Sequence, residues 1–137
     1  MSLLEPDQAT IAKPAIFIEA AHYDRLYALA RTALARQPEA ARLLLEEIER
    51  AAILEETGAS PSVVRMGGPV TFRDDRSGRV ETVRLVYPGE ADIAEGKVSV
   101  LTPIGAALIG MPQGGRIVWT AGDGSERSIT VLSVSDD

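Results

Sequence analysis

Hydrophobic residues recur every three or four positions in the first half of the chain and every second position in the second half. The segments Tyr23 to Arg36 and Pro38 to Glu55 each have the helical period. Pro38 disfavours helical geometry in the residue before it and suits the first turn of a new helix. The pattern predicts two antiparallel helices, each roughly 22 Å long at about 1.5 Å per residue, that project from a base with their turn at the tip.

The second predicted helix has one apolar stripe and one charged side. The stripe consists of Ala41, Leu44, Leu45, Ile48, Ala51 and Ala52. Glu47 falls among the charged residues that we expect on the solvated side, and Glu46 and Arg50 have the spacing of a helical ion pair.

Alternating runs beyond Ser60 predict β-strands separated by turns rich in glycine, proline and aspartate. The expected strands are 69–73, 80–86, 97–100, 116–120 and 128–134, with 63–66 leading into the first. The earlier apolar run Ala15 to Ile18 is short enough to be either a strand or a buried lead-in. Two hairpins that enclose one helix indicate an α+β fold with a mostly antiparallel sheet.

The helix between the hairpins is the stretch around which the sheet is expected to close. Thr102 is suited to cap its start, Pro103 to occupy its first position and Gly110 to end it. Only small and aliphatic residues lie between these ends, and a short helix that is apolar on all sides is normally buried.

Three segments follow from these patterns: an unpatterned, flexible tail at 1–13, a helical hairpin at 14–59, and a sheet domain at 60–137. Residues 57–62 have the composition of a linker.

The composition limits the partners and chemistry of the chain. There is no cysteine among the 137 residues, which excludes disulfides and thiol catalysis and suits a cytoplasmic protein. No apolar run is long enough to span a membrane, and the first residues do not form a secretory signal. A formal net charge of −6 disfavours direct nucleic-acid binding and favours a basic protein surface as partner.

No constellation of residues indicates an active site. His22 is the single histidine, and we expect it at the surface or capping a helix. The adjacent acidic pairs fit solvated faces and turns, the paired glycines fit turns, and Trp119 fits a core position. We therefore expect a binding protein without catalytic residues, metal or cofactor.

The stretch Val98 to Gly110, with Thr102-Pro103-Ile104-Gly105 at its centre, resembles the signature of bacterial Gre transcript-cleavage factors in their FKBP-like C-terminal domain. Other segments resemble the Rnk branch of that family, the regulators of nucleoside diphosphate kinase. They are Pro14 to Leu26, Val63-Val64-Arg65-Met66-Gly67, Thr82 to Pro88 and Glu90-Ala91-Asp92. The resemblance covers about residues 14 to 134; Gly114-Gly115 replaces the usual Gly-Asp turn.

The resemblance implies a protein that docks its C-terminal domain at the mouth of the RNA polymerase secondary channel and directs a short coiled coil toward it. Cleavage factors use acidic residues at the tip of a longer coil to help hold a second Mg²⁺. Here the hairpin is short and its tip carries one carboxylate, Glu39, beside Arg36. The expected function is thus non-catalytic competition with longer channel-binding factors, and an effect on nucleoside diphosphate kinase levels.

The residues expected at the partner surface are Leu101, Thr102, Pro103 and Ile104 in the domain and Gln37, Pro38 and Glu39 at the tip. Two alternatives remain open: a transcript-cleavage stimulator, and a prolyl isomerase of the FKBP type. The isomerase would need an aromatic pocket, and Phe17, Phe72, Tyr87 and Trp119 are scattered in the sequence.

Overall fold

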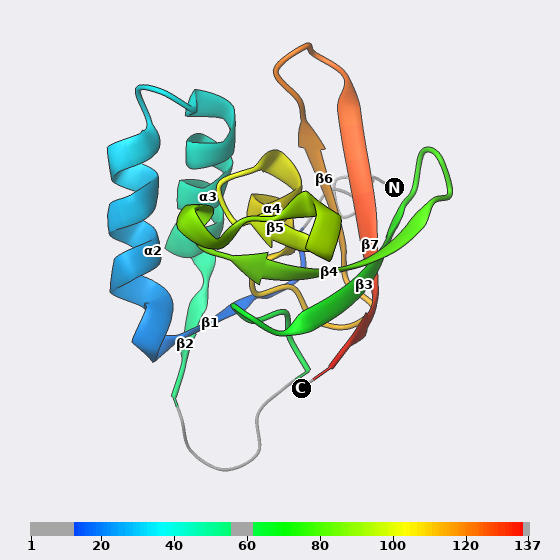
Figure 1. The fold of residues 1–137 in the computed structure, drawn as a ribbon, viewed down its shortest axis with the longest axis horizontal. Coiled ribbons are helices and arrows are strands. Elements are labelled where there is room, and N and C mark those ends of the chain that lie inside the picture. The colour runs from blue at the N-terminus through cyan, green and yellow to red at the C-terminus, as the bar shows by residue number, and fades with distance from the viewer. Residues whose placement is uncertain (1–12, 56–61, 136–137) are drawn as a thin grey trace, which may run out of the picture.

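The computed structural model describes residues 13–55 and 62–135 and combines two N-terminal helices with a curled sheet (Figure 1). The expected linker at 57–62 and the expected tail at 1–13 lie outside these residues, except for Ser62 and Lys13. The N-terminal elements are β1 (Phe17–Glu19), α2 (Ala20–Ala33), α3 (Pro38–Arg50) and β2 (Ala52–Leu54). The two helices contact each other, as expected from their facing apolar stripes.

The bounds predicted for both helices are wrong by a few residues. α2 begins and ends three residues before the predicted positions, and α3 ends at Arg50 instead of Glu55. Ala51 leaves the helix in an extended conformation, with ψ of 147°, and Ala52 donates its backbone N–H to the carbonyl of Ile16 at 3.0 Å. β2 therefore pairs in parallel with β1, so the run Ala15 to Ile18 contributes to a strand.

The second half of the chain forms a five-stranded sheet in the order β5-β4-β3-β7-β6. Its strands are β3 (Pro69–Asp74), β4 (Val80–Val86), β5 (Lys97–Ser99), β6 (Arg116–Thr120) and β7 (Glu126–Val134). Two 3-10 turns, η1 (Pro88–Glu90) and η2 (Ile93–Glu95), lie between β4 and β5. The β4–β5 pairing is parallel and the other pairings are antiparallel, which confirms the mostly antiparallel sheet.

Helix α4 (Pro103–Leu108) lies within the curl of the sheet, as its apolar sequence predicts (Figure 1). The Thr102 hydroxyl accepts a hydrogen bond from the backbone N–H of Gly105 at 3.0 Å and donates to the carbonyl of Ser99 at 2.8 Å. Gly105 is required here because a Cβ would lie 2.2 Å from that same carbonyl oxygen. The cap and the close approach together fix where α4 begins.

The helical hairpin does not project from a separate base, contrary to the sequence-based expectation. α3 packs against α4, and α2 lies on the outer side of α3 (Figure 1). The reason is that α3 buries two adjoining faces, with Ala41, Leu44 and Ile48 on one and Leu43 reaching the other. One continuous hydrophobic core consequently extends from α2 to β7.

Glu47 is also placed differently from the expectation, because it is fully buried instead of solvated. Its carboxylate accepts hydrogen bonds from Arg50, with Nη2 at 2.7 Å, and from the ammonium of Lys13 at 3.2 Å. Arg50 in turn donates to the carbonyl of Pro14. Arg50 is thereby engaged with Glu47 and not with Glu46, and the cluster ties the start of the described chain to α3.

Candidate functional site

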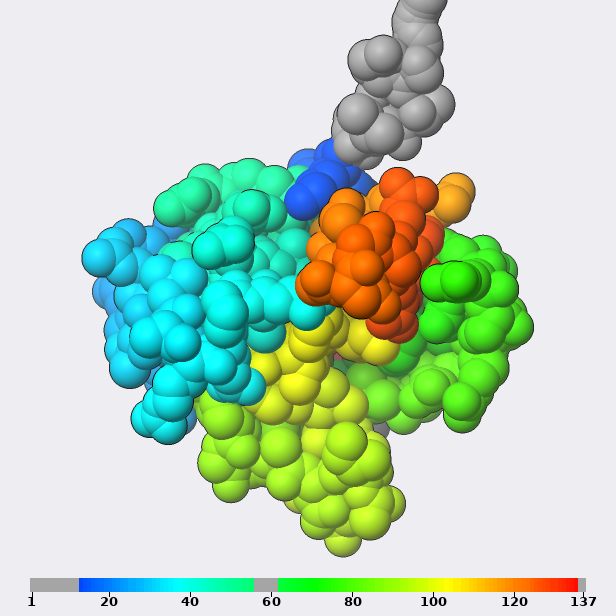
Figure 2. All heavy atoms as spheres, turned by 90° about the horizontal axis from the view of Figure 1, so that it is seen from above, coloured from blue at the N-terminus to red at the C-terminus, as the bar shows by residue number. Residues whose placement is uncertain are grey.

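The tip of the helical hairpin and the loop before α4 meet at one hollow of about 480 Å³. We call it the tip hollow; it is lined by Leu29, Thr32, Ala33, Arg36, Gln37, Pro88 and Leu101. It opens where the hairpin tip (cyan), the Pro88 segment (yellow-green) and the loop before α4 (yellow) come together in Figure 2. Gln37 of the predicted tip and Leu101 of the predicted docking loop thus share one site.

The other three residues of the loop before α4 have different environments. Thr102 is half-buried and occupied in capping α4, so its side chain has a structural task. Pro103 is half-exposed at the first position of the helix, and Ile104 packs partly against the core. Of these three, Pro103 is the one that a partner can reach without disturbing the cap or the core.

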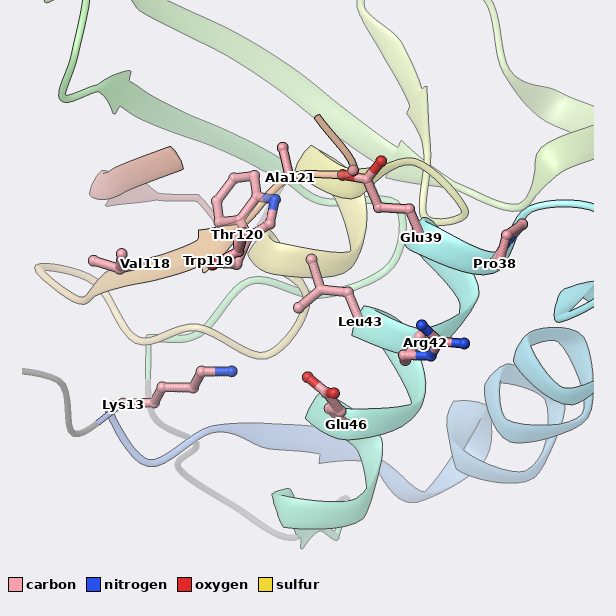
Figure 3. A pocket seen from close by; sticks show the side chains of 11 residues that line it. Lys13, Pro38, Glu39, Arg42, Leu43, Glu46, Val118, Trp119, Thr120 and Ala121 are labelled. Atoms are coloured by element: carbon pink, nitrogen blue, oxygen red, sulfur yellow. The ribbon is translucent and has the colours of Figure 1, made fainter. Parts of the chain in front are cut away.

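Pro38 and Glu39 do not line the tip hollow but a second depression, of about 580 Å³, between α3 and β6 (Figure 3). We call it the edge groove. Glu39 reaches across to the β6–β7 turn, where a Cβ on Gly122 would lie 2.8 Å from its Oε1. The β6–β7 turn (orange) accordingly lies against the start of α3 (cyan) in Figure 2. The predicted tip residues are therefore divided between two sites.

An aromatic cluster at the start of α2 joins the hairpin to the end of β4. His22 Nδ1 lies 2.7 Å from the hydroxyl oxygen of Tyr87, and the guanidinium of Arg25 lies 3.6 Å from the centre of the Tyr87 ring. Burial raises the pKa of Tyr87 above its ordinary value. His22 is thus half-buried and bonded to a distant residue, a role that its position in the sequence did not reveal.

Asp75, at the end of β3, is the best-connected carboxylate on the sheet. Burial alone would raise its pKa, but hydrogen bonds from Ser128, Thr130 and Arg73, with the charge of Arg116, outweigh burial and hold the pKa below its ordinary value. The hydrogen bonds from Ser128 and Thr130 link the end of β3 to β7, and an ion pair with Arg116, at 3.4 Å, links it to β6. Asp75 therefore stabilises the sheet and does not converge with other carboxylates.

Nothing in the described part of the chain gathers the groups that a metal site would need. Within residues 13–55 and 62–135, no three histidine, aspartate or glutamate side chains lie together in a way that could hold a metal ion. Of the four aromatic residues considered for an isomerase pocket, Trp119 alone lines the tip hollow or the edge groove.

The arrangement of a helical hairpin packed on a sheet with a central capped helix defines the class of the chain. Residues 59–136 match the family model of the GreA/GreB transcription elongation factor C-terminal domain. Because that match covers more than half of the chain, the protein belongs to the GreA/GreB transcription elongation factor family. Residues 14–54 match the model of the Rnk N-terminus, so the two matches together place it in the Rnk branch.

Individual relatives agree with this assignment. GreA of Bacillus cytotoxicus is 36% identical over 87 residues, which are 64% of this chain and 54% of the relative. The regulator of nucleoside diphosphate kinase of Escherichia coli is 33% identical over 88 residues, which are 64% of this chain and 65% of the relative. The match therefore spans between about half and two thirds of the length of these curated relatives.

A solved structure supports the same fold over nearly the whole chain. The GreA/GreB elongation factor from Nitrosomonas europaea superimposes with a TM-score of 0.67 and 32% identity, covering 90% of this chain and 99% of that one.

Among the residues that the structure describes, none of the helices combines the length and apolarity needed to cross a membrane.

Proposed function

We propose that this protein is a non-catalytic regulator of transcription that binds RNA polymerase near its secondary channel and competes there with Gre-type factors. It acts on the polymerase in the cytoplasm and needs no cofactor. The proposed regulation includes an effect on nucleoside diphosphate kinase levels, as the name of the Rnk relative suggests. We also propose that the C-terminal domain is FKBP-like and that α2 and α3 form a short coiled coil.

The tip hollow is the observation that carries the proposal. It brings Gln37 of the hairpin turn and Leu101 of the loop before α4 to one surface. Pro103, two residues after Leu101, is half-exposed. Leu101 itself is 5% exposed, so it forms the floor of the hollow and Gln37 its rim. A partner that docks on the domain would contact the hairpin tip at the same time.

The packing of the hairpin argues for regulation without transcript cleavage. Since α3 is held against α4, the hairpin adds little reach beyond the domain. Its one tip carboxylate, Glu39, lies against Gly122 in the edge groove. Delivery of a metal ion into the polymerase would need a longer coil and further carboxylates.

A binding titration against core RNA polymerase tests the proposal. The wild-type chain is expected to bind saturably and to be displaced by a Gre factor, while Pro103→Asp weakens binding at least tenfold. Asp is tolerated in the first turn of a helix, so this variant is expected to fold. Ser77→Asp, in the exposed β3–β4 turn, is the matched control and should bind normally.

Two results would contradict the proposal. Absence of binding at micromolar concentration removes the polymerase as partner. Mg²⁺-dependent shortening of RNA in a stalled complex would replace competition with the cleavage alternative.

A further inference from the structure

The edge groove exposes the outer edge of β6, which pairs with no other strand in the described residues. Ala121 donates its N–H to the carbonyl of Ser125, and Gly115 accepts from the N–H of Val131, both at 2.8 Å. In an antiparallel ladder, groups at alternate residues point to opposite edges. The N–H and C=O groups of Val118 and Thr120 consequently point away from β7, and within residues 13–55 and 62–135 they make no hydrogen bond.

Helix α3 forms the opposite wall of the groove and supplies charged side chains. Glu39, Arg42 and Glu46 line it from successive turns of the helix (Figure 3). In the part of the chain that the structure describes, none of the three has a hydrogen-bond or ion-pair partner. Lys13, at the far end, is already paired with Glu47. The charges on this wall that have no partner in the described residues are therefore negative at Glu39 and Glu46 and positive at Arg42 between them.

Trp119 supplies a second, independent indication of a ligand. Its side chain lines the groove and is 7% exposed, yet its indole N–H has no hydrogen-bond partner among the described residues. Figure 3 shows the indole nitrogen on the side of the ring that faces Glu39. A buried donor without an acceptor is costly to leave unmatched. The indole nitrogen is itself closed to solvent, so an oxygen acceptor of an occupant would reach it only after the neighbouring side chains move aside.

We propose that the edge groove binds an extended segment of a partner protein, which adds a strand to β6 and carries basic residues on the side that faces α3. Only an extended polypeptide presents donors and acceptors at the spacing of alternate strand residues, about 6.6–6.8 Å, to match Val118 and Thr120. The basic residues would meet Glu39 and Glu46. The proposal is independent of polymerase binding.

The geometry disfavours a second copy of this chain as the occupant. The β6 edge of any copy is accompanied by its own α3 on the same side. Pairing two such edges would bring two α3 helices, with their like-charged Glu39 and Glu46, into the space for one strand. A segment free of such a wall avoids this conflict.

The chain contains its own reporter for the test, because Trp119 is its only tryptophan. Random heptapeptides displayed on phage are selected on the immobilised full-length chain, and synthetic copies of the enriched peptides are titrated while Trp119 emission is followed. We expect enrichment of β-branched residues together with Lys or Arg. We also expect a saturable change in emission.

Two variants separate strand addition from other binding. Val118→Pro removes an outward N–H and no β6–β7 hydrogen bond, and it should weaken the peptides about tenfold. Glu46→Lys should weaken them several-fold, while Glu49→Lys, the same change at an exposed residue of α3 outside the groove, should not. Glu46 is exposed, so this pair of variants remains informative if Val118→Pro does not fold.

Four outcomes would overturn the proposal. The first is that no peptide is enriched, and the second is that the folded Val118→Pro variant binds the peptides as tightly as wild type. The third is that Glu46→Lys and Glu49→Lys change peptide binding equally. The fourth is that Trp119 emission changes with protein concentration in the absence of peptide, which would assign the groove to a second copy. Deletion of residues 1–12 is the remaining control. If peptides bind only after that deletion, the N-terminal segment of the chain is the occupant instead.

Discussion

Replacing Glu47 by glutamine keeps the size of the side chain but removes the one charged group that is completely buried in the described residues. Its partners are less enclosed, since the side chains of Lys13 and Arg50 are 29% and 26% exposed. After Glu47→Gln both cations can turn toward water. After Arg50→Ala, by contrast, a buried carboxylate keeps Lys13 as its single cationic partner, and the carbonyl of Pro14 loses its donor.

The difference in burial between the carboxylate of Glu47 and its two cationic partners determines how much each variant should lower the free energy of unfolding. Loss of charge-assisted hydrogen bonds in Glu47→Gln should lower the free energy of unfolding by about 2 kcal/mol. Arg50→Ala should lower it by about 3–5 kcal/mol, the usual cost of a buried charge deprived of its partner. The double variant should lose less than the sum of the two, by about 0.5–3 kcal/mol, because the residues interact directly.

Urea denaturation followed by circular dichroism measures all three values. Glu49→Gln is the matched control, since Glu49 lies on the same helix and is exposed; it should change the free energy of unfolding by less than about 0.5 kcal/mol. If Glu47→Gln behaves like Glu49→Gln, or if it costs more than Arg50→Ala, the reasoning from burial is refuted.

Three further variants test the sheet and the central helix. Asp75→Asn should destabilise the protein at pH 7. Because the folded pKa of Asp75 is lowered, the contribution of its charge to stability is present above the ordinary value of 3.8 and is lost as the pH falls through the folded value. The urea midpoints of wild type and variant should therefore converge as the pH falls below 3.8. Gly105→Ala should cost about 1–3 kcal/mol or more through the clash with Ser99, whereas Gly89→Ala, which meets no atom within 4 Å, should leave the melting temperature nearly unchanged. Thr102→Val should cost about 1 kcal/mol by removing the cap of α4, which thermal unfolding would detect; an unchanged melting temperature would contradict the capping role.

Local sequence patterns were sufficient where both the signal and its cause lie within a few residues. The predicted strands 80–86 and 116–120 coincide with β4 and β6, because each run of strand-forming residues is bounded by turn residues on either side. The start of α4 is likewise correct, since Thr102 and Pro103 determine it by themselves.

The sequence could not reveal β2, because its partner strand lies about 35 residues earlier. Phe17 pairs with Ala52 and Glu19 with Leu54. Alanine is the strongest helix former, so the helical period of the sequence continues through Ala51 and Ala52. The pairing with β1, and not local preference, ends α3 at Arg50.

Long-range contacts also explain the misplacement of Glu47 and of the hairpin. A charged residue between Leu43 and Ile48 looks solvated until Lys13, 34 residues earlier, is seen to contact it. A usable signal was the width of the apolar surface of α3, since Ala40 and Leu43 extend it beyond the predicted stripe. Such a wide apolar surface favours a helix enclosed on two sides over one that projects.

The candidate site was only partly accessible to sequence reasoning. The resemblance selected Leu101 and Gln37, but their meeting at the tip hollow depends on how α2, η1 and the α4 loop pack. Neither feature of the edge groove has a signature in the sequence: the indole N–H of Trp119 and the outer edge of β6, both without a hydrogen-bond partner in the described residues.

The most direct test of the central claim is a crosslinking measurement on the assembled complex. A photo-reactive amino acid placed at position 37, on the rim of the tip hollow, should crosslink to core RNA polymerase, and an excess of a Gre factor should abolish the product. The same amino acid at position 77, in the β3–β4 turn, should give none. Equal crosslinking at both positions, or a product at position 37 that the competitor leaves unchanged, would contradict docking through the tip hollow at the secondary channel.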